Sequence, residues 1–247
     1  MHNEEIDMDN EKGITISYSI LCHNEDTHLQ KLLQFLVQYK DKDDEIVVLD
    51  DYSDNEKTKQ ILHHFHTTDQ IKLYQRHLNR NFSSQRNYLN DISTGNYGFR
   101  IDADEIPTKW LIKNIKSILH TNPDIDKFLL PKINIIHGQT EKYKNLIKRE
   151  INSEGWINWP NYMQTIWKNV PWIYWINPVH ERLVGNDNHM LLPKEKKYSI
   201  YHEKHMSRFL ISSKLYTSIT LEHHEELYTQ RNIEKYEELF EMEMTDG

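Results

Sequence analysis

Several residue types are scarce in this chain of 247 residues, and each scarcity excludes a class of structure. The single cysteine, Cys22, excludes an intramolecular disulfide framework and a cysteine-based zinc site, and it suits a reducing compartment. The 7 glycines leave little material for a glycine-rich phosphate loop. The chain has no run of about 18 apolar residues, and residues 1–12 are acidic. We therefore expect no membrane span, no secretory signal and a cytoplasmic location, in the host cell if the source is a virus.

The remaining composition is that of a folded protein with an uneven distribution of charge. Hydrophobic residues make up 37% and aromatic residues 11%, which supplies a core and argues against disorder. The formal net charge is −8. Residues 1–12 carry five acids and one base, and residues 222–247 carry nine acids and two bases, which leaves residues 13–221 at +3. A mildly basic body suits an anionic small ligand and is too weak to indicate nucleic acid.

Strand-like and helix-like segments alternate along the first half of the chain. Short runs rich in apolar and β-branched residues predict strands, and apolar residues at helical spacing predict helices between them. The expected strands cover 13–21, 45–50, 71–78, 97–101 and 127–136. We expect Asp26 to cap the first helix, Ser83 or Ser84 to cap the third, and Pro107 to begin the fourth. This alternation predicts an α/β fold whose mostly parallel, Rossmann-like sheet is flanked by helices.

Polar residues follow the first, second and fourth of these strands, at the sheet edge where ligands of such folds bind. They are His23-Asn24-Glu25, Asp50-Asp51 and Asp102-Ala103-Asp104-Glu105. Asp102 and Asp104 can converge on one Mg²⁺ or Mn²⁺ ion that keeps positions for phosphate oxygens. Arg86, near a helix start, suits a diphosphate. Taken singly, each motif is more often a solvated turn, a helix cap or a surface arginine, so their combination carries the interpretation.

In this order the motifs resemble those of the family 2 glycosyltransferases of GT-A fold. The matching segments are Leu21-Cys22-His23-Asn24-Glu25, Asp50-Asp51-Tyr52-Ser53, Arg86-Asn87 and Asp102-Ala103-Asp104-Glu105. The resemblance covers residues 14–130 and continues more loosely through 177–185, which is similar to the Val-His-Glu segment of one branch of the family. It implies a metal-dependent transfer of a sugar from a nucleotide diphosphate donor to an acceptor hydroxyl, with inversion. A UDP-sugar is the expected donor.

The same resemblance implies the roles of individual residues. Nucleotide contacts fall to Leu21, His23, Glu25, Asp51, Arg86 and Asp102. The expected ligands of Mn²⁺ or Mg²⁺ are Asp104, Asp102 and His202, with His205 as the alternative histidine. The chain departs from the family pattern because Asn55 stands where the last Asp of the second motif belongs, with Asp54 one residue early, and because Tyr52 replaces a small residue.

An inverting transfer also needs a base that accepts the proton of the acceptor hydroxyl. We expect Glu181 to be this base, because it lies beyond the nucleotide half in an aromatic-rich region. His180 would orient it or line the pocket. Glu105 is the alternative base, and a surface pair of Glu181 with Arg182 is the alternative without catalysis. The tryptophans of segment 156–175 are expected to be mostly core, with one or two exposed for sugar recognition.

These assignments divide the chain into four parts. They are an acidic leader (1–12), a nucleotide-sugar-binding half (13–130), an acceptor-binding and catalytic half (131–221) and an acidic helical tail (222–247). The tail is a candidate for forming a homo-oligomer. The acceptor stays open between a glycan, a lipid-linked sugar, a protein and a modified nucleic-acid base. The alternatives are a sugar-phosphate nucleotidyltransferase, which normally has a glycine-rich loop after the first strand, and a degenerate GT-A domain that binds a nucleotide without turnover.

Overall fold

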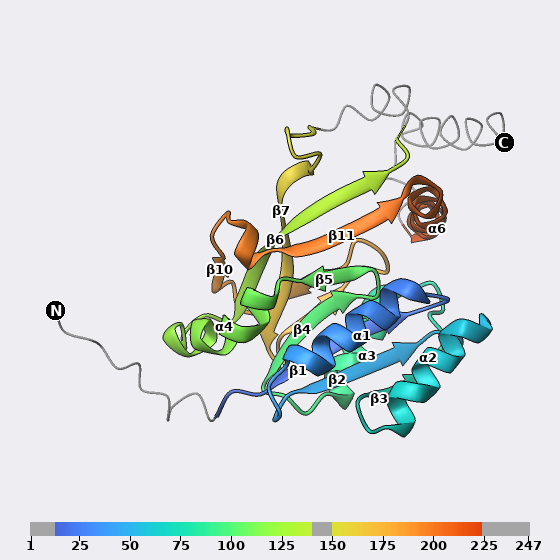
Figure 1. Cartoon of the computed structure of the whole chain (residues 1–247). Coiled ribbons are helices and arrows are strands. Elements are labelled where there is room, and N and C mark those ends of the chain that lie inside the picture. Colours follow the sequence, from blue (N-terminus) through green and yellow to red (C-terminus); the bar gives the residue numbers. More distant parts are fainter. Residues whose placement is uncertain (1–12, 140–149, 224–247) are drawn as a thin grey trace.

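A computed structural model of the chain describes residues 13–139 and 150–223. The predicted acidic leader, the centre of the polar segment 137–155 and the tail beyond residue 223 lie outside the described residues. Within them, a nine-stranded sheet has the order β3-β2-β1-β4-β7-β6-β11-β5, with β10 paired to β6 (Figure 1). Its strands are β1 (Ile16–Cys22), β2 (Glu45–Asp50), β3 (Lys72–Gln75), β4 (Tyr97–Asp102), β5 (Glu105–Pro107), β6 (Lys127–His137), β7 (Ile157–Lys168), β10 (His189–Leu191) and β11 (Ile200–His205).

Helices cover both faces of the sheet. They are α1 (Thr27–Tyr39), α2 (Glu56–Thr67), α3 (Phe82–Ile92), α4 (Lys109–Thr121), the short 3₁₀ helix η2 (Lys196–Tyr198) and α6 (Met206–His223). One core cluster joins α1, α2 and α4 to one face of the sheet, and α3 packs on the other face through Leu89. The predicted α/β fold with a mostly parallel sheet between helices is thus present in β3, β2, β1 and β4, which are parallel throughout.

The buried parallel strands explain why their sequences read as continuous apolar runs. Along β2, Ile46 and Val48 face the α1 side, and Val47 and Leu49 face the α3 side. Both faces of the strand are therefore covered, as is usual for parallel sheets. The second half of the sheet is mixed, because β7 runs antiparallel to β4 and β6, and β5 runs antiparallel to β11. The sheet is thus continuous across residue 130.

Two predicted helix starts are wrong. Asn81, rather than Ser83 or Ser84, caps α3, because its side chain accepts a hydrogen bond from the Ser84 backbone N–H at 2.9 Å. Pro107 ends β5 instead of beginning α4, and Thr108 caps that helix. The reason is tertiary, because Pro107 pairs with Ile200 of β11, a partner far along the chain.

A separate two-stranded hairpin, β8 (Tyr174–Ile176) and β9 (Arg182–Val184), follows β7. Its Trp175 packs against Trp167 in a small buried cluster, which agrees with the expectation that tryptophans here are mostly core. Trp172 is 58% exposed, and its loop begins beside Asn96, at the opposite end of β4 from Asp102. Among the described helices, none combines the length and the apolar character needed to cross a bilayer.

Candidate active site

The ends of β1, β2 and β4 bring the three sequence motifs to one edge of the sheet. β1 lies between the other two strands, with Cys22 opposite Asp50 on one side and Leu21 opposite Asp102 on the other. The residues that follow these strands therefore lie side by side, as the topology of parallel strands requires. Asp51 begins its turn by donating its backbone N–H to the Cys22 carbonyl at 2.9 Å.

Asp51 is surrounded by polar groups and is partly open to solvent. Its Oδ1 accepts a hydrogen bond from the Leu78 backbone N–H at 2.8 Å, and its side chain remains 26% exposed. The Nδ1 atoms of His23 and His77 each lie 3.9 Å from a carboxylate oxygen of Asp51. Tyr52 stacks on His77, with ring centroids 4.1 Å apart. Sequence reasoning missed His77, although it follows β3, the strand next to β2.

The departure from the family's second motif has a structural explanation. Asn55 caps α2 by accepting a hydrogen bond from the Thr58 backbone N–H at 3.0 Å. The early acid, Asp54, accepts from the side-chain amide of Asn24 at 2.9 Å and so ties the loop after β2 to the loop after β1. The amide of Asn55 therefore caps α2, and the carboxylate of Asp54 connects the two loops.

Arg86, Arg100, Asp102 and Glu181 form a charge cluster that is buried at Arg86 and partly exposed at Asp102. Arg86, with a side chain only 4% exposed, places Nη2 at 2.5 Å from Asp102 Oδ1 and Nε at 3.3 Å from Glu181 Oε1. Arg100 Nη2 lies 3.1 Å from Asp102 Oδ2 and 3.8 Å from Glu181 Oε1. Each Asp102 oxygen thus has its own guanidinium, and both arginines also approach Glu181. The structure therefore brings the predicted base to the predicted diphosphate-binding edge.

The electrostatics of this cluster follow from that arrangement. Burial acts to raise the pKa of Asp102, but the charges of Arg100 and Arg86 outweigh it and hold the pKa well below the ordinary value. Sequence reasoning missed Arg100. The signal was present, because Arg100 and Asp102 are two residues apart on one strand and so point to the same face.

Asp104 is contacted by two side chains from β11. Its Oδ2 lies 3.4 Å from His202 Nε2 and 2.9 Å from Lys204 Nζ. His202 and Lys204 share a face of the strand because they are two residues apart, whereas His205 has the opposite parity and its Nδ1 lies 3.1 Å from Ser207 Oγ. His202, rather than His205, is therefore the histidine beside Asp104. Lys204 was missed, because its relevance depends on the pairing of β11 with β5.

The donor set at Asp104 fits a divalent cation. The carboxylate oxygen and the imidazole Nε2 are close enough to share one ion, and Nδ1 of His202 lies 2.9 Å from Asn134 Oδ1, which fixes the ring. Burial lowers the pKa of His202 and Lys132 adds to this effect, which favours the neutral, metal-binding imidazole. In the described parts of the chain, no three His, Cys, Asp or Glu side chains converge. Two protein ligands are sufficient for Mg²⁺ or Mn²⁺ when phosphate oxygens and water complete the coordination.

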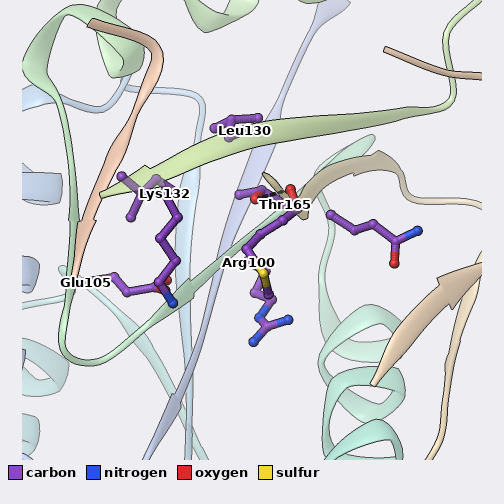
Figure 2. A pocket seen from close by; sticks show the side chains of 8 residues that line it. Arg100, Glu105, Leu130, Lys132 and Thr165 are labelled. Carbon is purple, nitrogen blue, oxygen red and sulfur yellow. Dashed lines mark hydrogen bonds and ion pairs between the residues drawn. The ribbon is translucent and has the colours of Figure 1, made fainter. Parts of the chain in front are cut away.

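Glu105, the alternative base, is turned into the protein. Its Oε2 accepts a hydrogen bond from the Asp102 backbone N–H at 2.9 Å, and its side chain forms a buried ion pair with Lys132. Figure 2 shows this pair on one side of a small pocket, while the Arg100 guanidinium points away from it. This geometry braces the turn that carries Asp102 and favours Glu181 over Glu105 as the base.

Helix α6 lies beside the same edge. Glu25, a predicted nucleotide contact, forms an ion pair with Arg208 of this helix. The Tyr216 ring lies 5.6 Å from the Phe82 ring and 6.2 Å from the exposed ring of His180, measured between centroids. Tyr216 is 36% exposed, and partial desolvation of its hydroxyl together with the negative charge of Asp102 raises its pKa.

Comparisons with known proteins agree with this geometry. The family model described as "Glycosyl transferase family 2" matches residues 17–183, which is more than half of the chain. The chain therefore belongs to glycosyl transferase family 2, and the expected membership of this enzyme family is confirmed. A search of curated protein sequences finds no match.

Solved structures confirm the GT-A-like fold. S. aureus TarS 1–349 superposes with a TM-score of 0.54 at 16% identity, covering 84% of this chain and 66% of that one. Its complex with UDP-GlcNAc gives 0.53 at 18% identity, covering 84% and 67%. Its complex with UDP gives 0.55 at 16%, covering 84% and 66%. The chain thus spans about two thirds of this TarS fragment, and 40% of the longer TarS structure.

Proposed function

We propose that this protein transfers a sugar from a UDP-sugar to an acceptor hydroxyl, with inversion at the anomeric carbon. The observation that carries the proposal is the meeting of three groups at one sheet edge. They are the open carboxylate of Asp51, the Arg86–Arg100–Asp102–Glu181 cluster, and the Asp104–His202 pair. Family membership supports the reaction class. The fold similarity to a structure solved with UDP-GlcNAc makes this nucleotide sugar the first donor to test.

The surroundings of Asp51 are the proposed nucleoside site. One carboxylate oxygen already accepts from the Leu78 backbone, and the partial exposure of the side chain leaves it able to accept an N–H from a base. His23 and the stacked pair of Tyr52 and His77 provide polar and aromatic walls. Leu21 and Glu25 lie before and after His23 along the end of β1 and are proposed to complete this side of the site.

The neighbouring charges are proposed to stabilise the leaving UDP. Asp104 and His202 would hold Mn²⁺ or Mg²⁺, which when bound neutralises negative charge on a diphosphate. Asp102 is proposed to contact the ribose from a carboxylate that Arg86 and Arg100 hold in place. Lys204 keeps a further positive charge beside Asp104, because this ion pair raises its pKa despite the opposing effect of burial. Fixed charges of this kind stabilise a leaving group without reorganisation.

Glu181 is proposed to act as the general base, with His180 lining the acceptor side. The acceptor oxygen bonds to the anomeric carbon, and the bond between that carbon and the diphosphate oxygen breaks. Its electron pair leaves with UDP, and the hydroxyl proton passes to Glu181. The two arginine contacts at Oε1 orient the carboxylate, and the side chain is only 10% exposed. A single displacement of this kind inverts the anomeric configuration.

The alternatives make different predictions. A nucleotidyltransferase would release inorganic pyrophosphate or consume a sugar phosphate, and a degenerate domain would bind UDP without turnover. The acceptor, whether a glycan, a lipid-linked sugar, a protein or a modified nucleic-acid base, is to be found by mass spectrometry of acceptor pools after incubation with the donor.

The test combines thermal shift with UDP release from UDP-GlcNAc, with GDP- and CDP-sugars as comparison donors. We expect UDP to raise the melting temperature only when Mn²⁺ is present, and Asp104→Ala to abolish this shift. Glu181→Gln should retain the shift and lose UDP release by about 100-fold or more. The exposed Asp43→Asn is the matched control and should behave as the unmodified chain. A metal-dependent shift that survives Asp104→Ala would contradict the proposed metal site, and full turnover by Glu181→Gln would contradict the proposed base.

A further inference from the structure

The hairpin that leads into and out of the Glu181 loop is held at both edges by side-chain amides. Asn87 of α3 accepts from the Trp175 backbone N–H at 2.8 Å and donates to the Trp175 carbonyl at 2.8 Å. Gln164 of β7 accepts from the Leu183 backbone N–H at 2.8 Å and donates to the Leu183 carbonyl at 3.0 Å. Trp175 and Leu183 face each other across the hairpin. The two amides therefore hydrogen-bond to the same cross-strand residue pair, Trp175 and Leu183, from the two outer edges of the hairpin.

These side-chain hydrogen bonds satisfy backbone groups that would otherwise be unpaired at the two edges of the hairpin. An isolated two-stranded hairpin is marginally stable and leaves unpaired backbone groups on both edges. Trp175 and Leu183 are each 2% exposed, so unpaired groups there would carry the full cost of desolvation. A carboxamide presents an N–H donor and a C=O acceptor side by side, which matches the C=O and N–H of a single strand residue. Asn87 and Gln164 thus complete the hairpin in place of further strands.

The residue pair Trp175 and Leu183, which the two amides hold, lies close in sequence and in space to the proposed reacting groups. Glu181 precedes Leu183 by two residues, and Asn87 follows Arg86, the residue that contacts both Glu181 and Asp102. One turn of α3 therefore fixes the backbone of the hairpin and the carboxylate that the hairpin carries. The loop between the strands is anchored a third time, because the Phe82 backbone N–H donates to the Pro178 carbonyl at 2.7 Å.

Resting on the proposed role of Glu181, we propose that Asn87 and Gln164 are positioning residues that set the distance of this carboxylate from the sugar. They act through the hairpin backbone and touch neither donor nor acceptor. Displacement of a reacting group by about 1 Å costs on the order of 100-fold in rate. Loss of the hydrogen bonds made by either Asn87 or Gln164 should therefore lower kcat and leave donor binding unchanged.

The first test uses Gln164→Met and Asn87→Leu, which keep similar volumes and remove both hydrogen bonds. We expect kcat for UDP release from UDP-GlcNAc to fall about 10- to 100-fold, with KM and the calorimetric Kd for UDP changed less than about twofold. Gln164→Glu keeps an acceptor for the Leu183 N–H and should recover part of the rate. A fall in UDP affinity equal to the fall in kcat would overturn the inference.

The matched control is Asn96→Leu. Asn96 also makes two side-chain bonds to backbone groups, accepting from the Thr15 N–H at 2.9 Å and donating to the Gly13 carbonyl at 2.6 Å, but at the far end of β4. Because Asn96 is exposed, we expect this variant to lose less stability than Gln164→Met, with kcat unchanged. An equal loss of kcat in both would assign the effect to general destabilisation and overturn the inference.

A double variant separates positioning from folding. Because Gln164 acts through Glu181, Gln164→Met should add no loss to the residual rate of Glu181→Gln. Equal losses in both backgrounds would overturn the positioning role while leaving the proposed base intact. Full turnover by Glu181→Gln would instead overturn the base, and the inference with it.

A readout without any substrate completes the test. Amide hydrogen exchange across residues 174–184 should become faster in Gln164→Met than in the unmodified chain, with exchange in β1 and β2 unchanged. Unchanged exchange across 174–184 would overturn the inference, whatever the donor proves to be.

Discussion

At the scale of single residues, one carboxylate oxygen of Asp104 is close to both a lysine and a histidine, which affects how Asp104 can bind a metal ion. Lys204 Nζ lies 2.9 Å from Oδ2, the oxygen that also faces His202 Nε2 at 3.4 Å. A divalent cation bound by Asp104 and His202 would therefore lie near an ammonium group. Like charges at such distances repel strongly where the surroundings are partly buried.

We expect Lys204→Met to strengthen metal binding, because it removes the competing positive charge from Asp104. The Mn²⁺ concentration that gives half of the UDP-dependent thermal shift should fall about tenfold. A titration of Mn²⁺ at fixed UDP measures this concentration. Lys196→Met, at an exposed lysine of η2, is the control and should leave it unchanged. An unchanged or higher requirement in Lys204→Met would show that the lysine does not compete with the metal.

Some residues of the candidate site could be predicted from the sequence, and others could not. Motif order was sufficient to place Asp51, Asp102 and Asp104 together, because parallel strands end at one edge. Glu181 was chosen from the chemistry of an inverting transfer, and its role as the base stays a prediction. Arg100 was missed although its position two residues before Asp102 on one strand places both side chains on the same face. Lys204 was missed because its relevance depends on the neighbours of β11, which local sequence does not reveal.

At the scale of elements, one carboxylate connects β1, β2 and β3 at the end of the sheet remote from the site. Glu45 begins β2 and accepts from Ser17 Oγ at 2.5 Å and from the Thr94 backbone N–H at 2.6 Å. Lys72 Nζ, at the start of β3, lies 2.5 Å from its Oε2. Burial acts to raise the pKa of Glu45, but the contacts from Lys72, Ser17 and Thr94 outweigh it and lower the pKa from 4.5 to about 2.

A depressed pKa means that the ionised form stabilises the fold. The contribution is complete above pH 4.5 and is lost as the pH falls through about 2. We expect Glu45→Gln to lower the free energy of unfolding by about 2 kcal/mol at pH 7, which is less than the full pKa shift implies because Lys72 is half exposed.

Urea unfolding of both proteins from pH 7 to pH 2 measures this difference, which should shrink towards zero at the acid end. Glu56→Gln, which affects an exposed pair with Lys59, is the control and should show little change across the same range. A constant difference between Glu45→Gln and the unmodified chain would assign the effect to packing instead of charge.

At the scale of elements, local sequence patterns predicted helix α1 but did not predict strand β5. The spacing of Leu29, Leu32, Leu33 and Leu36 was sufficient to predict α1, because these side chains form one buried stripe. The β5 strand was not predicted, because its three residues have no periodicity of their own. Their extended conformation depends on pairing with β11, nearly 100 residues later.

At the scale of the whole molecule, α6 connects the end of the described chain to its first half. Arg208 pairs with Glu25 after β1, and Arg80 before α3 contacts both Glu222 and Ser218 of α6. These ion pairs are partly exposed, so each contributes less than about 1 kcal/mol and weakens with salt. The contribution of these ion pairs to the packing of α6 therefore falls as ionic strength rises.

We expect Arg208→Ala to speed amide hydrogen exchange across residues 206–223, and to change the free energy of unfolding by less than about 1 kcal/mol. High salt should have the same effect on the unmodified chain. Lys197→Ala, which removes a pair with Glu195 on η2, is the control and should leave exchange in α6 unchanged. Equal exchange in Arg208→Ala and the unmodified chain at low salt would contradict this account of how α6 is held.

The place of β11 between β6 and β5 has a consequence for biosynthesis. Asp102 and Asp104 leave the ribosome early, whereas His202 and Lys204 follow about 100 residues later, and only then does β5 gain its partner. A nascent polypeptide that has completed β1 to β5 thus carries Asp102 with its two arginine partners, and Asp104 without the two β11 side chains that contact it. Among the described strands, β11 comes last in the chain, so the sheet edge that holds the proposed site is complete only after this strand has joined β6 and β5.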